Sequence, residues 1–400
     1  MKGITRKLPY AWLIVMLLAA GLSVWVIKKL DRANLGEHHF QKFVSLIELA
    51  QFPEAQPEIE KAIRLSPDNA YYISGQALLH QRMMQARFDP EAYVANRLSL
   101  SEEDHRHVKA AISAYERAIE LNPNDGCFNH NVGWLYSFLN DKQKALQFFM
   151  RAVEIDGANG LYRGSLALFY EQSALSEDAE RQYFLAVCLS PGVLDSRFFS
   201  DFNRRSPAGA ERVVSESISY LEARVRQGGD SAFKAKLGKL YLYKNERGAA
   251  EMLKEATTKL PNLSRPWLYL GKVYANQSNS EEAKRCYEKA AFLDATGFLA
   301  QHELGRLYER DQKTADAIRW YQSAASNWLS KTSSSARKAL RIYLAAHVVR
   351  DDIVPEGLLS YFEPSFDFAG TCMRLSGLYR ETGNAERANY YDHLSRSSTF

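Results

Sequence analysis

The sequence predicts an all-α protein in which about ten helical hairpins follow one membrane-spanning helix. Two observations predict this arrangement: residues 10–27 contain no charge, and the body after them repeats a pattern of small, apolar and aromatic side chains with a regular period. The composition agrees, since 46% of the 400 residues are apolar and 24% are charged. The formal net charge of +4 is too small for a protein that binds by neutralising phosphates, so we expect no nucleic-acid partner.

The first 35 residues are predicted to anchor the chain in a membrane. Residues 1–9 form a short basic N-terminus, residues 10–27 a transmembrane helix and residues 28–35 a basic linker. The 18 residues of the helix cover about 27 Å, close to the thickness of a bilayer core. A cleaved signal peptide is the alternative, but the apolar run is long and ends in Val-Ile-Lys-Lys without a small-x-small cleavage site. Three Lys or Arg residues lie on each side of the apolar run, so the positive-inside rule does not decide the orientation. We favour a short N-terminus on the inner side of the membrane and the body on the outer side.

The clearest hairpin is predicted at 264–297. Its two helices carry, in order, Trp267, Leu270, Gly271, Tyr274, Ala283, Tyr287 and Ala290. A small residue lets two helices approach closely, and the aromatic residue fills the space to the next hairpin. The same pattern returns 34 residues later in Leu304, Gly305, Tyr308, Ala317, Tyr321 and Ala324, and this spacing is the period of the repeat.

Laid over the body, residues 36–400, the period predicts a series of units. Clear units lie near 36–69, 126–159, 160–193, 230–263, 264–297, 298–331 and 369–400. A split unit covers 68–125, and its insert at 83–104 is expected to be a loop with a short helix. The stretches 194–229 and 332–368 have the length of a unit without its pattern, so they are divergent repeats or spacers.

The pattern from Trp267 to Ala290 resembles the tetratricopeptide repeat. The resemblance implies a right-handed α-solenoid in which each hairpin contacts its neighbours and the first helices line a concave groove. In that family the second, fifth, sixth, ninth and twelfth positions of each first helix touch the ligand. The residues at these positions are His130, Asn131, Trp134, Lys236, Lys239, Arg265, Tyr269, Lys272, His302 and Arg306, followed by Arg374 and Arg380 in the last unit.

The predicted groove is basic toward the C-terminus. Lys236, Lys239, Arg265, Lys272 and Arg306 come from three consecutive units and predict binding of an acidic peptide or helix. A solvated face without ligand preference is the alternative. The body is also polarised, because residues 33–200 carry 15 basic and 22 acidic residues, whereas residues 201–400 carry 30 and 24. Such asymmetry favours steering of a partner or head-to-tail self-association.

The sequence contains no motif for catalysis, a cofactor or a metal. The four Cys residues are far apart, and the His residues lack the spacing of a metal site on one helical face. We therefore expect a non-enzymatic protein without cofactor or metal.

The resulting hypothesis is a membrane-anchored scaffold that captures a segment of a partner protein in its groove. The resemblance suggests assembly of an envelope, secretion or polysaccharide-export complex, with the solenoid on the periplasmic side of a bacterial inner membrane. Two alternatives remain: an accessory enzyme with a site at the insert or the divergent units, and an outer-membrane receptor of an organelle with a cytosolic solenoid.

Overall fold

The computed structural model describes residues 29–47, 49–84, 90–95, 99–245, 247–333 and 366–397. All regular elements within these ranges are helices, which confirms the predicted all-α class. The expected basic N-terminus and membrane helix lie outside the described residues, as does most of the divergent unit 332–368. Among the helices that are described, none combines the length and the apolar character that crossing a bilayer requires.

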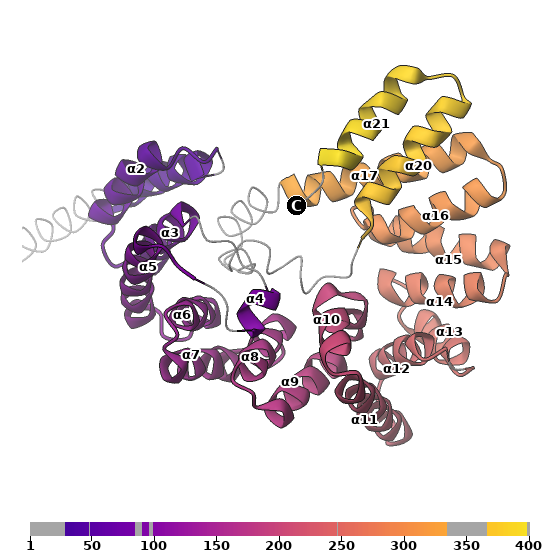
Figure 1. Ribbon diagram of the computed structural model, residues 1–400, viewed down its shortest axis with the longest axis horizontal. Coiled ribbons are helices and arrows are strands. Elements are labelled where there is room, and N and C mark those ends of the chain that lie inside the picture. The colour runs from indigo at the N-terminus through magenta and orange to yellow at the C-terminus, as the bar shows by residue number, and fades with distance from the viewer. Residues whose placement is uncertain are drawn as a thin grey trace, which may run out of the picture. The chain divides into compact units, whose positions relative to one another are not determined.

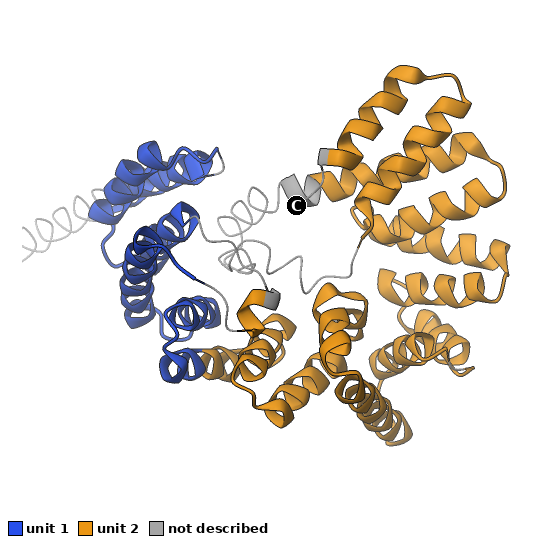
Figure 2. Ribbon diagram, viewed as in Figure 1, with its two compact units in different colours: residues 1–87, 99–148 blue, residues 88–98, 149–400 orange. Residues whose placement is uncertain are grey.

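The chain forms two compact units (Figures 1 and 2). Unit 1 comprises residues 1–87 and 99–148, and unit 2 comprises residues 88–98 and 149–400. The helices of unit 1 are residues 29–47, α2 (Phe52–Leu65), α3 (Ala70–Met83), α5 (Glu102–Leu121) and α6 (Gly126–Phe138), with the first half of α7 (Lys142–Ile155).

Unit 2 holds the remaining helices. They are α4 (Pro90–Val94), α8 (Gly160–Gln172), α9 (Ser176–Leu189), the 3-10 helix η1 (Pro191–Asp195), α10 (Arg197–Arg205), α11 (Pro207–Arg226), α12 (Ser231–Tyr243), α13 (Ala249–Lys259), α14 (Ser264–Asn276), α15 (Ser280–Leu293), α16 (Phe298–Arg310), α17 (Thr314–Ser333), α20 (Phe368–Glu381) and α21 (Ala385–Ser397). Apart from α4 and η1, Figure 1 shows them as antiparallel pairs along this unit.

The turn inside a hairpin is built the same way in several repeats. A residue with positive φ lies two positions after the first helix: Ala174 at 58°, Ser278 at 59° and Gln312 at 59°. The amide of the next residue then donates to a carbonyl one turn back, as Leu175 does to Tyr170 at 2.9 Å. This is the Schellman arrangement, which satisfies carbonyls that the helix end would leave unpaired.

The repeat period reflects a close contact between the two helices of a hairpin. A Cβ on Gly271 would lie 2.5 Å from the Tyr287 ring, and one on Gly305 would lie 2.6 Å from the Tyr321 ring. Both tyrosine side chains are buried. The glycine is therefore required by the aromatic residue that packs onto it, and the two recur together.

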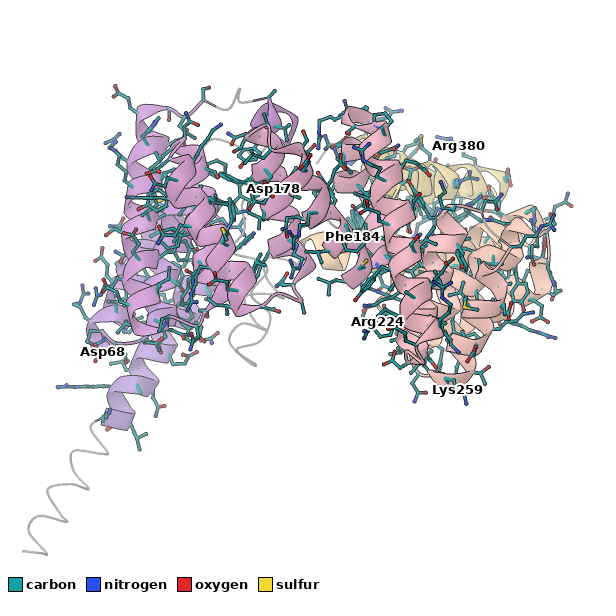
Figure 3. All side chains as sticks on the ribbon, turned by 90° about the horizontal axis from the view of Figure 1, so that it is seen from below. Asp68, Asp178, Phe184, Arg224, Lys259 and Arg380 are labelled. Carbon is teal, nitrogen blue, oxygen red and sulfur yellow. The ribbon has the colours of Figure 1, made fainter. Side chains whose placement is uncertain are left out.

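The stretch 194–229 contains a hairpin with a short first helix, α10, and a long second helix, α11. Its aromatic residues continue the core, because the Tyr183 ring stacks on the rings of Phe198 and Phe202 at centroid distances of 4.6 and 3.8 Å. Phe184, labelled in Figure 3, meets the Tyr220 ring of α11 edge-on. Packing of this kind explains how a hairpin forms without the repeat pattern.

Two segments differ in detail from the sequence-based expectation. Residues 29–35, expected as a linker, are helical and continuous with the helix up to residue 47. They contain neither Pro nor Gly, so nothing in them stops the helix before residue 36. In the stretch 83–104, α4 is the short helix, and the helix that follows begins at Glu102 behind a capping box formed by Ser101 and Asp104.

Candidate ligand-binding pockets

The first helices of four hairpins in unit 2 line one pocket, called here the basic pocket. It has a volume of about 570 Å³ and is lined by residues of α12, α14, α16 and α20, together with Asp195 of η1 and Tyr287 of α15. Its charged residues are Lys239, Lys272, Arg306, Arg310 and Arg374 against Asp195, Glu303 and Glu309. The lining residues therefore carry two more positive than negative formal charges, so the pocket favours an anionic ligand.

Four predicted groove residues lie in this pocket: Lys239, Lys272, Arg306 and Arg374. The first three occupy the same position in consecutive first helices, so the repeat itself brings them together. Lys272 and Arg306 are partly exposed, with 27% and 56% of their side chains accessible. Both can therefore reach a ligand.

Lys239 is placed differently from the expectation, because it is 2% exposed. Its Nζ donates to Oδ1 of Asp195 at 2.7 Å and lies 5.3 Å from the Tyr269 ring centre. Burial lowers the pKa of Lys239, and the Asp195 carboxylate opposes that shift. Lys239 thus acts as a buried counterion of Asp195 and not as an exposed contact for a ligand.

The acidic residues of the basic pocket are held by neighbouring donors. Glu309 accepts from the Tyr321 hydroxyl at 2.6 Å and from Arg374 at 3.0 Å. Glu303 lies 3.2 Å from the Arg306 guanidinium. Since half of the Arg374 side chain is exposed, the guanidinium remains accessible from solvent while it holds Glu309.

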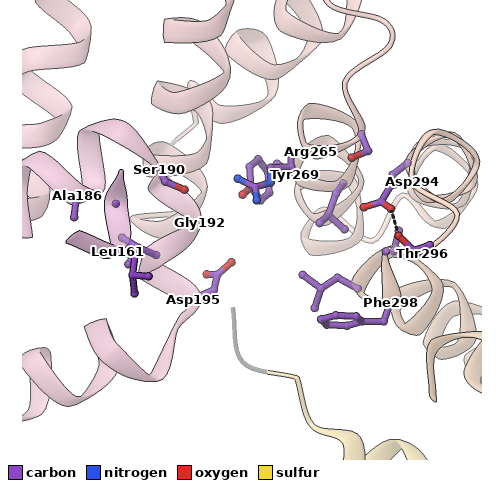
Figure 4. A pocket seen from close by; sticks show the side chains of 18 of the residues that line it. Leu161, Ala186, Ser190, Gly192, Asp195, Arg265, Tyr269, Asp294, Thr296 and Phe298 are labelled. Atoms are coloured by element: carbon purple, nitrogen blue, oxygen red, sulfur yellow. Dashed lines mark hydrogen bonds between the residues drawn. The ribbon is translucent and has the colours of Figure 1, made fainter. Parts of the chain in front are cut away.

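A second pocket, the polar pocket, lies between α8, η1, α14 and α16 and has a volume of about 460 Å³ (Figure 4). The predicted residues Arg265 and Tyr269 line it, opposite Leu161 and Gly192. Burial raises the pKa of Tyr269 to about 12, and Asp195 adds to this while Arg265 opposes it. The Tyr269 hydroxyl therefore stays protonated at neutral pH and can donate to an acceptor.

Asp195 lines both pockets. It lies on η1, immediately before the short helix α10. The 3-10 turn contains Pro191, which fixes the backbone where a long first helix would otherwise begin. The divergent unit thereby supplies a carboxylate to the surface of its neighbours.

The remaining predicted site residues lie outside both pockets. His130, Asn131 and Trp134 of unit 1 are at most 1% exposed, so their side chains do not offer a ligand surface. The Trp134 indole donates to Nε2 of His130 at 3.2 Å, and burial lowers the pKa of His130 to about 3. These three side chains form core contacts, which corrects the expectation that they line a groove.

His302 and Lys236 are also absent from the pocket linings. His302 packs into the next hairpin, with Nδ1 3.0 Å from the Thr371 hydroxyl and its ring 5.4 Å from that of Phe366. Lys236 lies 5.8 Å from the centre of the Phe233 ring on its own helix. Arg380 pairs with Asp392 inside the last hairpin.

Sequence reasoning missed several pocket residues. Tyr243, Asn276 and Arg310 each end the first helix of a consecutive hairpin, just after the twelfth position, so the period itself would have found them. Asp195 has no such signal, because its unit lacks the repeat pattern. No group of three or more His, Cys, Asp or Glu side chains close enough for a metal occurs in the described ranges.

Comparison with known proteins identifies the repeat. Residues 96–125, 114–147 and 268–329 match sequence profiles of the tetratricopeptide repeat. The chain thus carries tetratricopeptide repeats in both of its units.

One curated relative is the BBSome complex member BBS4 of Bos taurus, 23% identical over 283 residues. The match covers 70% of this chain and 49% of the relative, so the chain spans about half the relative's length.

Two solved structures are similar at low identity. Yeast Tom70 is 16% identical with a TM-score of 0.41, over 84% of this chain and 61% of that one. YrrB, described as a tetratricopeptide protein with an unusual peptide-binding site, is 17% identical with a TM-score of 0.25, over 57% and 98% of the two chains.

Proposed function

We propose that this protein is a scaffold that captures an acidic segment of a partner protein in the basic pocket of unit 2. Tetratricopeptide repeats indicate a protein–protein interaction scaffold. The observation that carries the proposal is the basic pocket itself, where the first helices of four hairpins present an excess of positive charge. An acidic segment would supply the missing negative charges.

The exposed cations suit carboxylates. Arg306 lies on α16 and Arg374 on α20, and half or more of each side chain is accessible. A guanidinium can bind a carboxylate through two parallel hydrogen bonds. Lys272 adds a third partly exposed cation. The name of the matching relative describes a member of a complex, which is consistent with a scaffold role.

We further propose that residues 10–27 anchor the scaffold in a membrane, in the setting of an envelope, secretion or polysaccharide-export complex at a bacterial inner membrane. The uncharged run and its basic flanks support this proposal. A reporter enzyme fused after Phe400 tests the topology. Activity of a periplasmic reporter is expected, and activity of a cytoplasmic reporter alone would favour the organelle-receptor alternative.

The binding proposal is tested with the full chain in detergent and a short, capped, fluorescent peptide in which Glu alternates with Ala. The triple variant Lys272→Glu, Arg306→Glu and Arg374→Glu is expected to abolish the rise in fluorescence anisotropy. Lys239 is left unchanged, because a carboxylate in its place would be buried beside Asp195.

A matched control makes the same charge change elsewhere. Lys259, Arg285 and Arg319 lie exposed on second helices of the same unit, outside both pockets. Their triple reversal to Glu is expected to retain most of the binding. Equal loss in both triple variants would mean that overall charge, and not the basic pocket, attracts the peptide.

A further inference from the structure

The two helices of a hairpin are joined by a polar pair twelve residues apart. The Tyr183 hydroxyl donates to Glu171 at 2.5 Å, and the Tyr321 hydroxyl donates to Glu309 at 2.6 Å. In the last hairpin the same two positions hold Arg380 and Asp392, which form an ion pair. A side chain that can form a hydrogen bond on the second helix thus has its partner near the end of the first.

The hairpin of α14 and α15 departs from this rule. Tyr287 is 1% exposed, and its hydroxyl has no hydrogen-bond partner among the described residues. The residue twelve positions earlier is Ala275, which has no polar atom to offer. A buried hydroxyl without a partner is rare in folded proteins, because its lost hydration is not replaced.

The place that a longer side chain at position 275 would occupy borders the basic pocket. Ala275, Asn276, Tyr287 and Arg306 all line that pocket. In the following hairpin the corresponding volume is taken by the Glu309 carboxylate, which lies between the Tyr321 hydroxyl and the Arg374 guanidinium. The basic pocket therefore lacks one carboxylate at a place where the repeat elsewhere supplies it.

We propose that a carboxylate of the captured partner occupies this place, as the side chain of a Glu or Asp in an acidic segment. It accepts the hydrogen bond of the Tyr287 hydroxyl and pairs with Arg306, as Glu309 pairs with Tyr321 and Arg374. This inference rests on the proposed function and adds the position and the donor of one subsite. A protein segment fits better than a small acid, because the pocket extends over four first helices and shares Asp195 with the polar pocket.

The test uses the same full chain and capped acidic peptide. Tyr287→Phe is expected to weaken binding about tenfold or more, since it removes a hydrogen bond to a charged group. The same variant is expected to be as stable as the wild type or more stable without peptide, because the removed hydroxyl has no partner. Tyr183→Phe is the matched control: it loses the bond to Glu171, should melt at a lower temperature, and should bind the peptide with unchanged affinity.

A second pair of variants fills the subsite from within. Ala275→Glu places a carboxylate within reach of Tyr287 and is expected to abolish binding while raising the melting temperature. Asn276→Glu adds the same charge to the same pocket one residue further on, at a position that the repeat does not pair with residue 287, and is expected to weaken binding less.

The outcomes separate the subsite from the scaffold proposal. Peptide binding that is lost on charge reversal but unchanged in Tyr287→Phe and Ala275→Glu would overturn the subsite and leave the proposed function intact. If the wild-type chain did not bind the acidic peptide, both the subsite and the proposed function would be overturned. Free glutamate competing as well as the peptide would show a small-molecule carboxylate site and overturn the assignment to a protein segment.

Discussion

Replacing Gly271 with Ala tests the close contact that sets the repeat. A Cβ there would lie 2.5, 2.6 and 3.1 Å from three atoms of the Tyr287 ring, whereas ordinary contacts begin near 3.4 Å. The ring has little room to retreat, because it is buried in a cluster with Ala283, Ala290 and Leu304. An added methyl group in such a core costs about 1–3 kcal/mol.

The gain in helix propensity offsets part of this cost. Ala is more favourable than Gly inside a helix by about 1 kcal/mol, so we expect Gly271→Ala to lower the free energy of unfolding by up to about 2 kcal/mol. Gly377 provides the matched control, because it lies inside the first helix of another hairpin and a Cβ there meets nothing within 4 Å. Gly377→Ala should therefore stabilise by about 0.5–1 kcal/mol.

Denaturant unfolding followed by circular dichroism measures both variants, and hydrogen exchange locates the change. Faster exchange in Gly271→Ala should be confined to α14, α15 and α16, because each hairpin of a repeat array depends mainly on its neighbours. If Gly271→Ala were as stable as Gly377→Ala, the contact with Tyr287 would not be the reason for the glycine.

Two further predictions concern the turns and the pH dependence. Ala174→Gly should raise the free energy of unfolding by about 1 kcal/mol, because Ala174 has φ 58° and a residue with a Cβ is strained in the left-handed region. Gly383→Ala, at φ 78° in the last hairpin, should lower the free energy of unfolding by the same amount. Denaturant melts that show a less stable Ala174→Gly or a more stable Gly383→Ala would contradict this. Acidification should destabilise unit 2 through His302. Burial lowers the pKa of His302 to about 4, and the charges of Arg306 and Arg374 add to this shift. The carboxylates of Asp367 and Glu309 oppose it. Between about pH 6.5 and 4 the unfolded chain binds a proton at His302 that the folded chain does not, so the free energy of unfolding falls by up to about 1.4 kcal/mol per pH unit as the pH drops. His302→Gln should therefore lose less stability than the wild type between melts at pH 7 and pH 5. An identical slope in both proteins would rule out this role of His302.

The sequence predicted the hairpins well because their determinants are local. Gly271 and Tyr287 show the pairing of small and large side chains directly, and the period then repeats it at Gly305 and Tyr321. In contrast, the hairpin of α10 and α11 is stabilised by aromatic stacking on Tyr183, a contact that no fixed spacing announces.

The candidate site was predicted in part, for a related reason. Lys272 and Arg306 follow from their position in the first helix, but exposure at that position depends on what the neighbouring unit places over it. Asp195 comes from the divergent unit, and its carboxylate accepts a hydrogen bond from the buried amine of Lys239. Trp134 and His130 are large enough to fill the space between helices and are buried together. The period of the repeat predicts which face of its helix a residue lies on. Whether that residue is buried depends on side chains of other units, which are far away in the sequence.

The carboxylate of Asp195 also links the two pockets thermodynamically. It borders both, and in the basic pocket it lies 2.7 Å from the Lys239 amine and 3.9 Å from that of Lys272. A ligand that attracts Lys272 in the basic pocket leaves Asp195 less neutralised where it faces Arg265 in the polar pocket. Occupancy of either pocket then changes the affinity of the other by the same factor, because binding free energies are reciprocal. Titrating the acidic peptide in the wild type and in Arg265→Gln measures how far the charge at Arg265 affects binding in the basic pocket, and equal affinities would show that Asp195 does not couple the two pockets.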